Sequence, residues 1–197
     1  GLGDVYKRQL VFGASIAESL VQPHFVVSGR GIDDEIPGMP GINRQSMDIL
    51  IETISQALSL GLFAHMIFPV MGESEKDPEG TKAADDGMPL QRTIRELKEM
   101  FGDEILLMTD ACLCTSTDHG HCGLLEGHNI VNDPSVETLV GISLSHARAG
   151  ADYVCLSDMM DGRVGAIRKC LDTNGLANTS ILAYSVKYAS HFYSPFR

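Results

Sequence analysis

The sequence predicts a parallel α/β protein, in which strands and helices alternate along the chain. Five short apolar runs recur between residues 21 and 187, and such runs form strands that are buried on both faces. Stretches with helical spacing separate most of them, so that successive strands are joined by right-handed crossovers in one sheet. Two architectures fit this pattern: an open doubly wound sheet and a (β/α)8 barrel.

The strands are recognised as apolar runs bounded by turn residues. They are expected at residues 21–27, 62–68, 105–108, 153–157 and 181–187. Pro23 lies near the start of the first strand, which is one of the few strand positions that tolerates proline. His65 lies in the middle of the second strand, where we expect a hydrogen-bonded core histidine rather than a ligand.

The helices are recognised by their capping residues and apolar stripes. They are expected at residues 46–60, 89–101, 134–149 and 159–171. Ser46 and Asp133 are suited to cap the first and third helices. Gly61 and Gly150 follow the same two helices at positions where glycine commonly ends a helix.

Two connections are longer than ordinary linkers. Residues 28–44 contain several prolines and glycines, which predicts an irregular loop. Residues 72–87 are polar and acidic and follow a strand. This second segment is expected to be either a mobile lid or binding loop, or a plain solvated loop.

Charge and composition exclude several classes of partner. The 197 residues include 15 basic and 26 acidic side chains, a net charge of −11, and no basic run. A nucleic acid or an anionic membrane is therefore not expected as a partner. No apolar run is long enough to span a bilayer, and no secretory signal is recognisable. The five cysteines are odd in number, and three of them are clustered. This indicates a reducing compartment, and we expect the cytoplasm.

Three cysteines after the third strand form the first candidate site. Cys112, Cys114 and Cys122 follow the spacing C-x-C-x7-C directly after the apolar run at residues 105–108. On an extended backbone Asp110, Cys112 and Cys114 share one side, and a seven-residue loop can return Cys122 to them. Thiolates that converge in this way select zinc or another thiophilic metal.

The sequence leaves the nature of this cluster open. Chance clustering and a disulfide are the alternatives to metal binding. If a metal binds, His119 or His121 could complete a closed structural site with four protein ligands. Three thiolates alone would leave one coordination position for water or substrate, which is typical of a catalytic zinc site.

Polar side chains at other strand ends form a second candidate centre. Asp110, Ser157 and Lys187 all lie where predicted strands end, and active sites of barrels are built at that edge. Alternation along the fifth strand places Ile181 and Ala183 on the face of Lys187, which we expect to point into the barrel. A desolvated amine there could attack a carbonyl to form a Schiff base, whereas the alternative is a solvated lysine. No dinucleotide fingerprint or P-loop is present.

Three segments together resemble one enzyme family. Residues 110–123, 157–164 and 184–197 are similar to porphobilinogen synthase, also called 5-aminolevulinate dehydratase. The resemblance extends in collinear order over residues 20–197. It implies a (β/α)8 TIM barrel with an N-terminal arm, assembled into homo-octamers. We therefore expect residues 20–197 to be an incomplete barrel of about five β/α units, and residues 1–19 to be a leader unrelated to the family or a remnant of the arm.

The resemblance also implies roles for individual residues. It assigns the catalytic positions to Lys187, Asp110 and Ser157, the binding of a substrate carboxylate to Arg197, and the zinc ligands to Cys112, Cys114 and Cys122. The implied reaction joins two molecules of 5-aminolevulinate, with loss of two waters, to form porphobilinogen for haem and related tetrapyrroles. Zinc would act as a Lewis acid, and Lys187 would hold a substrate ketone as an imine.

Two departures from the family pattern limit these expectations. Ser194 stands where the family usually has glycine, and the second Schiff-base lysine lies on a later strand that this sequence does not contain. We therefore expect the chain as given to be nearly inactive, and prone to aggregation because its barrel edges are unpaired. A class I aldolase-like lyase and a non-enzymatic zinc-binding module are the alternative functions.

Overall fold

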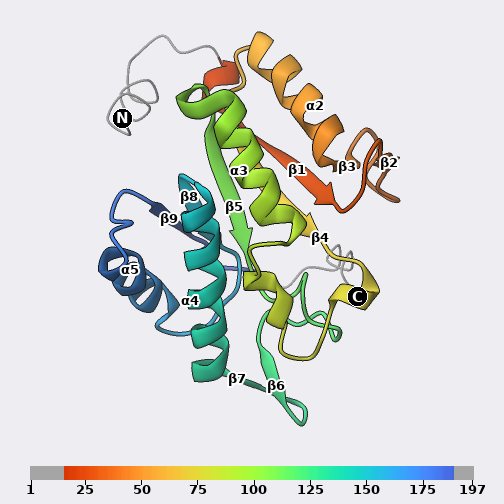
Figure 1. Ribbon diagram of the computed structural model, residues 1–197. Helices are drawn as coiled ribbons and strands as arrows, with labels where there is room; N and C mark the ends of the chain where they lie inside the picture. Colours follow the sequence, from red (N-terminus) through yellow and green to blue (C-terminus); the bar gives the residue numbers. More distant parts are fainter. Residues whose placement is uncertain (1–15, 189–197) are drawn as a thin grey trace.

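A computed structural model describes residues 16–188, and a sheet of seven strands lies at its centre (Figure 1). The strands, in sheet order, are β2 (Asp33–Glu35), β3 (Asn43–Ser46), β1 (Val21–Val27), β4 (Ala64–Val70), β5 (Leu106–Ala111), β8 (Tyr153–Leu156) and β9 (Ser180–Ala183). Strands β1, β4, β5, β8 and β9 are those expected from the sequence, and each is parallel to the next. The predicted parallel α/β class is confirmed.

Four helices accompany the sheet, each close to its expected position. They are α2 (Met47–Ser59), α3 (Pro89–Phe101), α4 (Asn132–Ala149) and α5 (Arg163–Thr173). Short 3-10 turns cover Ile16–Ser19, Glu73–Glu75, Thr81–Ala84 and Gly102–Glu104. A separate antiparallel hairpin of β6 (Leu124–Glu126) and β7 (Asn129–Val131) extends beyond the end of α4 (Figure 1). This hairpin was not expected from the sequence.

All four helices pack on the same face of the sheet. Leu107 of β5 packs with side chains of α2 and α3, and Val154 of β8 packs with side chains of α4 and α5. The opposite face, which we call the inner face, carries a cluster around Leu106, Met108 and Cys155 that contains no helical residue. Helices in a doubly wound sheet cover both faces, and its strand order reverses at a switch point. The five parallel strands show neither feature.

The expected loop at residues 28–44 contains regular structure instead. Strand β3 pairs in parallel with β1, with Arg44 opposite Phe25, and β2 adds to β3 in antiparallel fashion. Asp33 holds the two short strands together by accepting hydrogen bonds from the side chains of Asn43 and Gln45. These strands are polar and very short, so they have no apolar alternation by which the sequence could reveal them.

The last predicted helix and strand are both shorter than expected. Helix α5 begins at Arg163 because the Asp158 carboxylate accepts a hydrogen bond from the Met160 amide and fixes a turn before the helix. Strand β9 ends at Ala183. The face assignment of this strand was wrong: Ile181 packs with the helices, whereas Tyr184 packs on the inner face.

The acidic segment at residues 72–87 is anchored against the cysteine region. Asp77 accepts hydrogen bonds from Thr81 and pairs through the backbone with Thr117. Gly80 adopts a left-handed backbone, and a Cβ added there would lie 2.8 Å from the Ser116 hydroxyl oxygen. The segment therefore supports the loop that follows β5.

His65 is a core histidine, as expected. Its Nδ1 lies 3.0 Å from Nε2 of His24, and both residues are buried. The pair lies between β1 and β4, where burial lowers the pKa of His24 to about 3 and that of His65 to about 4. Between residues 16 and 188, no helix is both long and apolar enough to cross a membrane.

Candidate metal centre and active site

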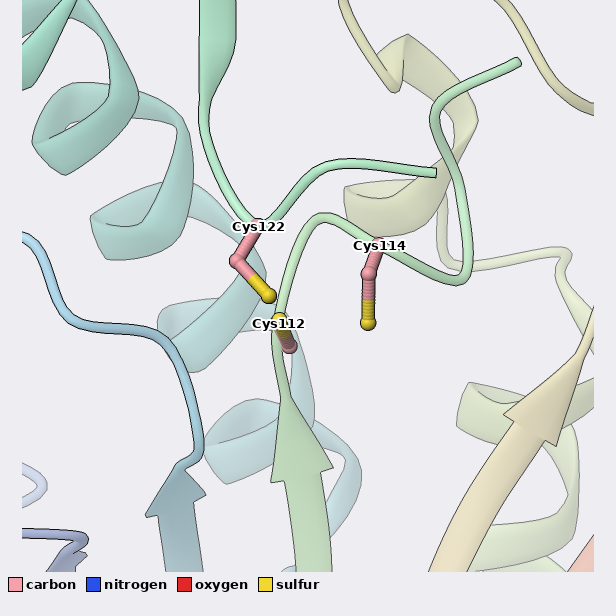
Figure 2. Close-up of side chains that lie close together, drawn as sticks. All are labelled: Cys112, Cys114 and Cys122. Atoms are coloured by element: carbon pink, nitrogen blue, oxygen red, sulfur yellow. The ribbon is translucent and has the colours of Figure 1, made fainter. Parts of the chain in front are cut away.

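The end of β5 brings the three cysteines of the C-x-C-x7-C segment together. Cys112 follows the last residue of the strand, Cys114 lies on the turn beyond it, and Cys122 returns on a second pass of the chain (Figure 2). Cys112 and Cys114 are buried, and Cys122 is half-buried. Their three sulfur atoms all lie within 4.8 Å of one another.

This geometry fits a metal ion that prefers sulfur ligands. Structural and catalytic zinc sites both use thiolates that converge on one point. All five cysteines are free, so the structure does not form the disulfide that the sequence left open. In the part of the chain that the structure describes, no histidine or carboxylate joins the three sulfurs as a potential ligand.

The three thiols are coupled by hydrogen bonds. Bonds from Cys112 and Cys114, helped by the nearby ammonium of Lys187, hold the pKa of Cys122 well below its usual value. The hydrogen bonds of Cys112 with Cys114 and Cys122, together with burial, raise the pKa of Cys112. Among the three thiols, loss of a proton is therefore favoured at Cys122, whose sulfur the Lys187 ammonium contacts.

Backbone and hydroxyl hydrogen bonds fix the loop between the cysteines. The Leu113 carbonyl accepts bonds from both Ser116 and Thr117. The Thr117 hydroxyl also donates to the His121 carbonyl, one residue before Cys122, at 3.1 Å. The cysteine loop is thus held before any ion binds.

Neither candidate histidine belongs to the sulfur cluster. His119 Nδ1 accepts a hydrogen bond from the His121 amide, and its Nε2 lies 3.3 Å from the Pro78 carbonyl oxygen. The two imidazole rings lie 5.4 Å apart, against the acidic segment rather than among the sulfurs. The described residues therefore provide the three-thiolate set, not the closed four-ligand set.

Lys187 reaches the same point from the other side. Its ammonium donates a hydrogen bond to the Cys122 sulfur at 3.4 Å and another to the Ser157 carbonyl oxygen at 3.1 Å. The lysine lies four residues beyond the end of β9, so an extended segment rather than the strand itself carries it to the site. The expected proximity of amine and sulfurs is observed, although the alternation used to predict it fails in this segment.

Asp110 and Ser157 form a direct pair beside the cluster. The Ser157 hydroxyl donates a hydrogen bond of 2.6 Å to Oδ1 of Asp110, linking the ends of β5 and β8. Burial raises the pKa of Asp110 to about 6, although the bond from Ser157 opposes the shift. A carboxyl group in this range can hold or release a proton near neutral pH. Arg197, the expected ligand of a substrate carboxylate, lies outside the described residues.

A hollow of about 560 Å³, open to solvent, adjoins Cys114 on the inner face. The rings of Phe25 and Phe68 stack in its wall, with their centroids 5.3 Å apart, and Arg44 also lines it. These lining residues were not predicted from the sequence. The alternation of β1 and β4 could have placed the two phenylalanines on one face, but the unpredicted β3 carries Arg44.

A family model described as delta-aminolevulinic acid dehydratase matches residues 5–197. The chain belongs to this family. Among curated relatives, the dehydratase of Methanothermobacter thermautotrophicus is 48% identical over 180 residues, which cover 90% of this chain and 54% of the relative. That of Halalkalibacterium halodurans is 43% identical, with 91% and 54% covered.

A solved member of the family has the same fold over the shared region. The crystal structure of the Toxoplasma gondii delta-aminolevulinic acid dehydratase, in complex with the reaction product porphobilinogen, matches with a TM-score of 0.89 and 44% identity. The match covers 96% of this chain and 54% of that chain. The chain thus spans about half the length of these three relatives, although it covers 86% of the shorter Ruminiclostridium josui sequence.

Proposed function

We propose that this chain supplies half of the active site of a porphobilinogen synthase, which condenses two molecules of 5-aminolevulinate with loss of two waters. The observation that carries the proposal is the contact between the Lys187 ammonium and the sulfur of Cys122 within a three-cysteine cluster. Membership of the dehydratase family and the product bound to the Toxoplasma relative support the choice of substrate.

We further propose that the metal held by the cluster is zinc. Cys112, Cys114 and Cys122 would hold it, because three thiolates suit its preference for soft ligands and leave a coordination position free. When bound, zinc supplies Lewis acidity toward an oxygen atom of a substrate.

The protein groups around the cluster account for imine formation. The amine of Lys187, after losing a proton, would attack the ketone carbon of one 5-aminolevulinate, forming a C–N bond while the carbonyl oxygen leaves as water. Asp110 would donate or accept protons in this exchange, because burial raises its pKa to about 6. Ser157 would orient the carboxyl group through its 2.6 Å hydrogen bond.

Several wider expectations also stand as proposals. The single-sided helix layer and the strand order support a partial TIM barrel over residues 20–197. The family match from residue 5 favours the arm remnant over an unrelated leader for residues 1–19. A cytoplasmic location, assembly of the full-length enzyme into homo-octamers, and a carboxylate-binding role for Arg197 rest on the family resemblance.

Imine trapping tests the proposal directly. Purified chain is incubated with 5-aminolevulinate and borohydride, and the mass added to each lysine-containing peptide is measured. We expect one substrate-derived adduct on Lys187. Lys187→Met should abolish the adduct, whereas Lys169→Met, at an exposed position on α5, should leave it unchanged.

A sugar-phosphate ketone separates the aldolase-like alternative from the proposed activity. That alternative gives the cysteines no role, and it leaves the contact between the Lys187 ammonium and the Cys122 sulfur unexplained. Trapping of the sugar phosphate in preference to 5-aminolevulinate would overturn the proposed substrate. Trapping on lysines other than Lys187 would overturn the proposed catalytic residue.

A further inference from the structure

Arg163, the first residue of α5, joins the two strand ends that carry Ser157 and Lys187. One terminal nitrogen of its guanidinium donates to the Met160 carbonyl at 2.9 Å, and the other donates to the Tyr184 carbonyl at 3.1 Å. Met160 lies three residues beyond Ser157, and Tyr184 lies three residues before Lys187. A single side chain therefore connects the segments that leave β8 and β9.

The arginine is itself held in place by a buried carboxylate. Its Nε lies 3.2 Å from Oδ1 of Asp158, whose side chain is fully buried, while the Arg163 side chain is 12% exposed. Asp158 also accepts a hydrogen bond from the Met160 amide at 2.8 Å. The planar guanidinium thus contacts one carboxylate and two carbonyls at once, a pattern that the single ammonium of lysine cannot reproduce.

Other contacts also hold the described segment that Arg163 restrains. Beyond β9 the described chain is irregular from residue 184 to residue 188. The Tyr184 amide bonds to the Leu156 carbonyl, and the Lys187 ammonium bonds to the Ser157 carbonyl and the Cys122 sulfur. The Tyr184 ring also packs on the inner face, and its hydroxyl donates to the Met66 sulfur at 3.6 Å. Without the arginine, the Tyr184 carbonyl would lose its contact with the turn at Met160, and the backbone leading to Lys187 would be held by the Tyr184 amide and side chain.

We propose that Arg163 is a positioning residue that sets the distance between the Lys187 amine and the cysteine cluster. It acts by fixing the Tyr184 carbonyl against the Asp158–Met160 turn, and it does not itself contact the sulfurs or the amine. The inference rests on the proposed function only in that the Lys187 amine is the reacting group. Its structural part, that Arg163 orders residues 184–188, stands independently.

Arg168 on the same helix provides a matched control. It also donates to two backbone carbonyls, those of Thr179 and Leu176, and contacts a carboxylate, that of Asp172. These bonds lie before β9, at the end of the strand away from Lys187. Loss of Arg168 should therefore destabilise the fold in a similar way without disturbing the lysine.

The experiment compares Arg163→Met, Arg163→Lys and Arg168→Met with the unaltered chain. Hydrogen exchange of a peptide covering residues 181–188 reports the order of the segment, and borohydride trapping with 5-aminolevulinate reports the reactivity of Lys187. For Arg163→Met we expect faster hydrogen exchange in this peptide. The maximal rate of trapping should be at least about tenfold lower, with little change in the 5-aminolevulinate concentration that gives half of that rate. The exchange and trapping rates of Arg163→Lys should lie between those of Arg163→Met and the unaltered chain. Arg168→Met should match the unaltered chain once both rates are expressed per folded molecule.

Unchanged hydrogen exchange at residues 181–188 in folded Arg163→Met would overturn the inference. An equal loss of trapping rate per folded molecule in Arg163→Met and Arg168→Met would also overturn it. Absence of trapping by the unaltered chain would instead contradict the proposed function, and the exchange data would still decide whether Arg163 orders the segment. If Arg163→Met does not fold, Arg163→Lys carries the test, because it keeps the charge beside Asp158 and loses only the second carbonyl contact.

Discussion

At the scale of single residues, the candidate metal centre depends on a backbone position where a side chain would meet close neighbours. Gly123 follows Cys122, and a Cβ added there would lie 2.6 Å from Cγ2 of Ile130 and 3.1 Å from the Ser135 hydroxyl oxygen. Ile130 belongs to the β6–β7 hairpin, and Ser135 also holds the Leu124 amide at 2.8 Å. The return of Cys122 to the other sulfurs therefore requires glycine at the next position.

Gly123→Ala should weaken metal binding and lower stability together. We expect a loss of about 1–3 kcal/mol in the free energy of unfolding from overpacking. Displacement of Cys122 should weaken the affinity for Zn²⁺ by about tenfold or more. Chelator competition and urea unfolding provide the two measurements.

Gly165→Ala is the control for that change. Nothing lies within 4 Å of a Cβ at Gly165, which lies in α5, so alanine there should leave Zn²⁺ affinity unchanged and stability unchanged or slightly higher. Equal Zn²⁺ affinity in the Gly123 and Gly165 variants would show that the close approach at Gly123 does not position Cys122.

At the scale of elements, one carboxylate joins α3, β5 and the turn before β8. Asp152 accepts a 2.7 Å hydrogen bond from the Leu107 amide and forms an ion pair with Lys98 of α3 at 3.1 Å. Both charged side chains are about one-fifth exposed. The contact fixes β8 against β5, and thereby Ser157 against Asp110.

Asp152→Ala should lower the free energy of unfolding by about 1–3 kcal/mol, because it leaves a buried amide without its acceptor and a half-buried ammonium without its partner. Thermal or urea unfolding measures this loss. Glu73→Ala removes the partner of Lys76 in an exposed ion pair, and it should have almost no effect. If Asp152→Ala and Glu73→Ala lowered the free energy of unfolding by a comparable amount, burial would not be what makes the Asp152 contacts stabilising.

The element boundaries show what the sequence could and could not predict. Helix α3 and strand β1 have the expected bounds because proline, glycine and apolar periodicity mark their ends. Strand β9 was predicted too long and with its faces exchanged. Pairing of Leu182 with Cys155 determines which face each residue occupies, and such pairing depends on a strand distant in sequence.

The candidate site was predictable to a similar degree. The cysteines have distinctive chemistry and spacing, so their convergence could be predicted before the structure was known. Lys187 could be placed at the same edge only as the end of a predicted strand, and its role was predicted from the resemblance to porphobilinogen synthase. Neither Arg163 nor the hollow beside Cys114 could be predicted from the sequence. An arginine that binds carbonyls looks like an ordinary surface residue, and a phenylalanine on the inner face looks like an ordinary core residue. Their roles depend on neighbours that only the folded chain brings together.

At the scale of the whole molecule, buried histidines make stability depend on pH. Burial lowers the pKa of His24 to about 3, and that of His65 and His146 to about 4, whereas an unfolded histidine titrates near 6.5. The unfolded chain therefore binds protons that the folded chain does not, and stability falls as pH drops below 6.5 until the folded values are reached. Asp110, with its pKa raised to about 6, acts in the opposite direction between about pH 6 and 3.8.

Substitution of the histidine pair isolates its contribution. We expect the double variant His24→Leu/His65→Leu to lose less stability between pH 7 and pH 5 than the unaltered chain. Each histidine contributes at most about 1.4 kcal/mol per pH unit, and Asp110 contributes equally to both proteins. Urea unfolding at the two pH values gives the difference, and an equal loss in both proteins would show that the pair does not oppose protonation.

The order of the parallel strands has a consequence for biosynthesis. Because β1, β4, β5, β8 and β9 join the sheet in the order in which they occur in the chain, each can dock on finished structure as the ribosome releases it. The cysteine loop leaves the ribosome 65 residues before Lys187, so the three sulfurs can come together while the segment that carries the amine is still being synthesised. The nascent polypeptide can therefore complete its sulfur cluster before it acquires Lys187.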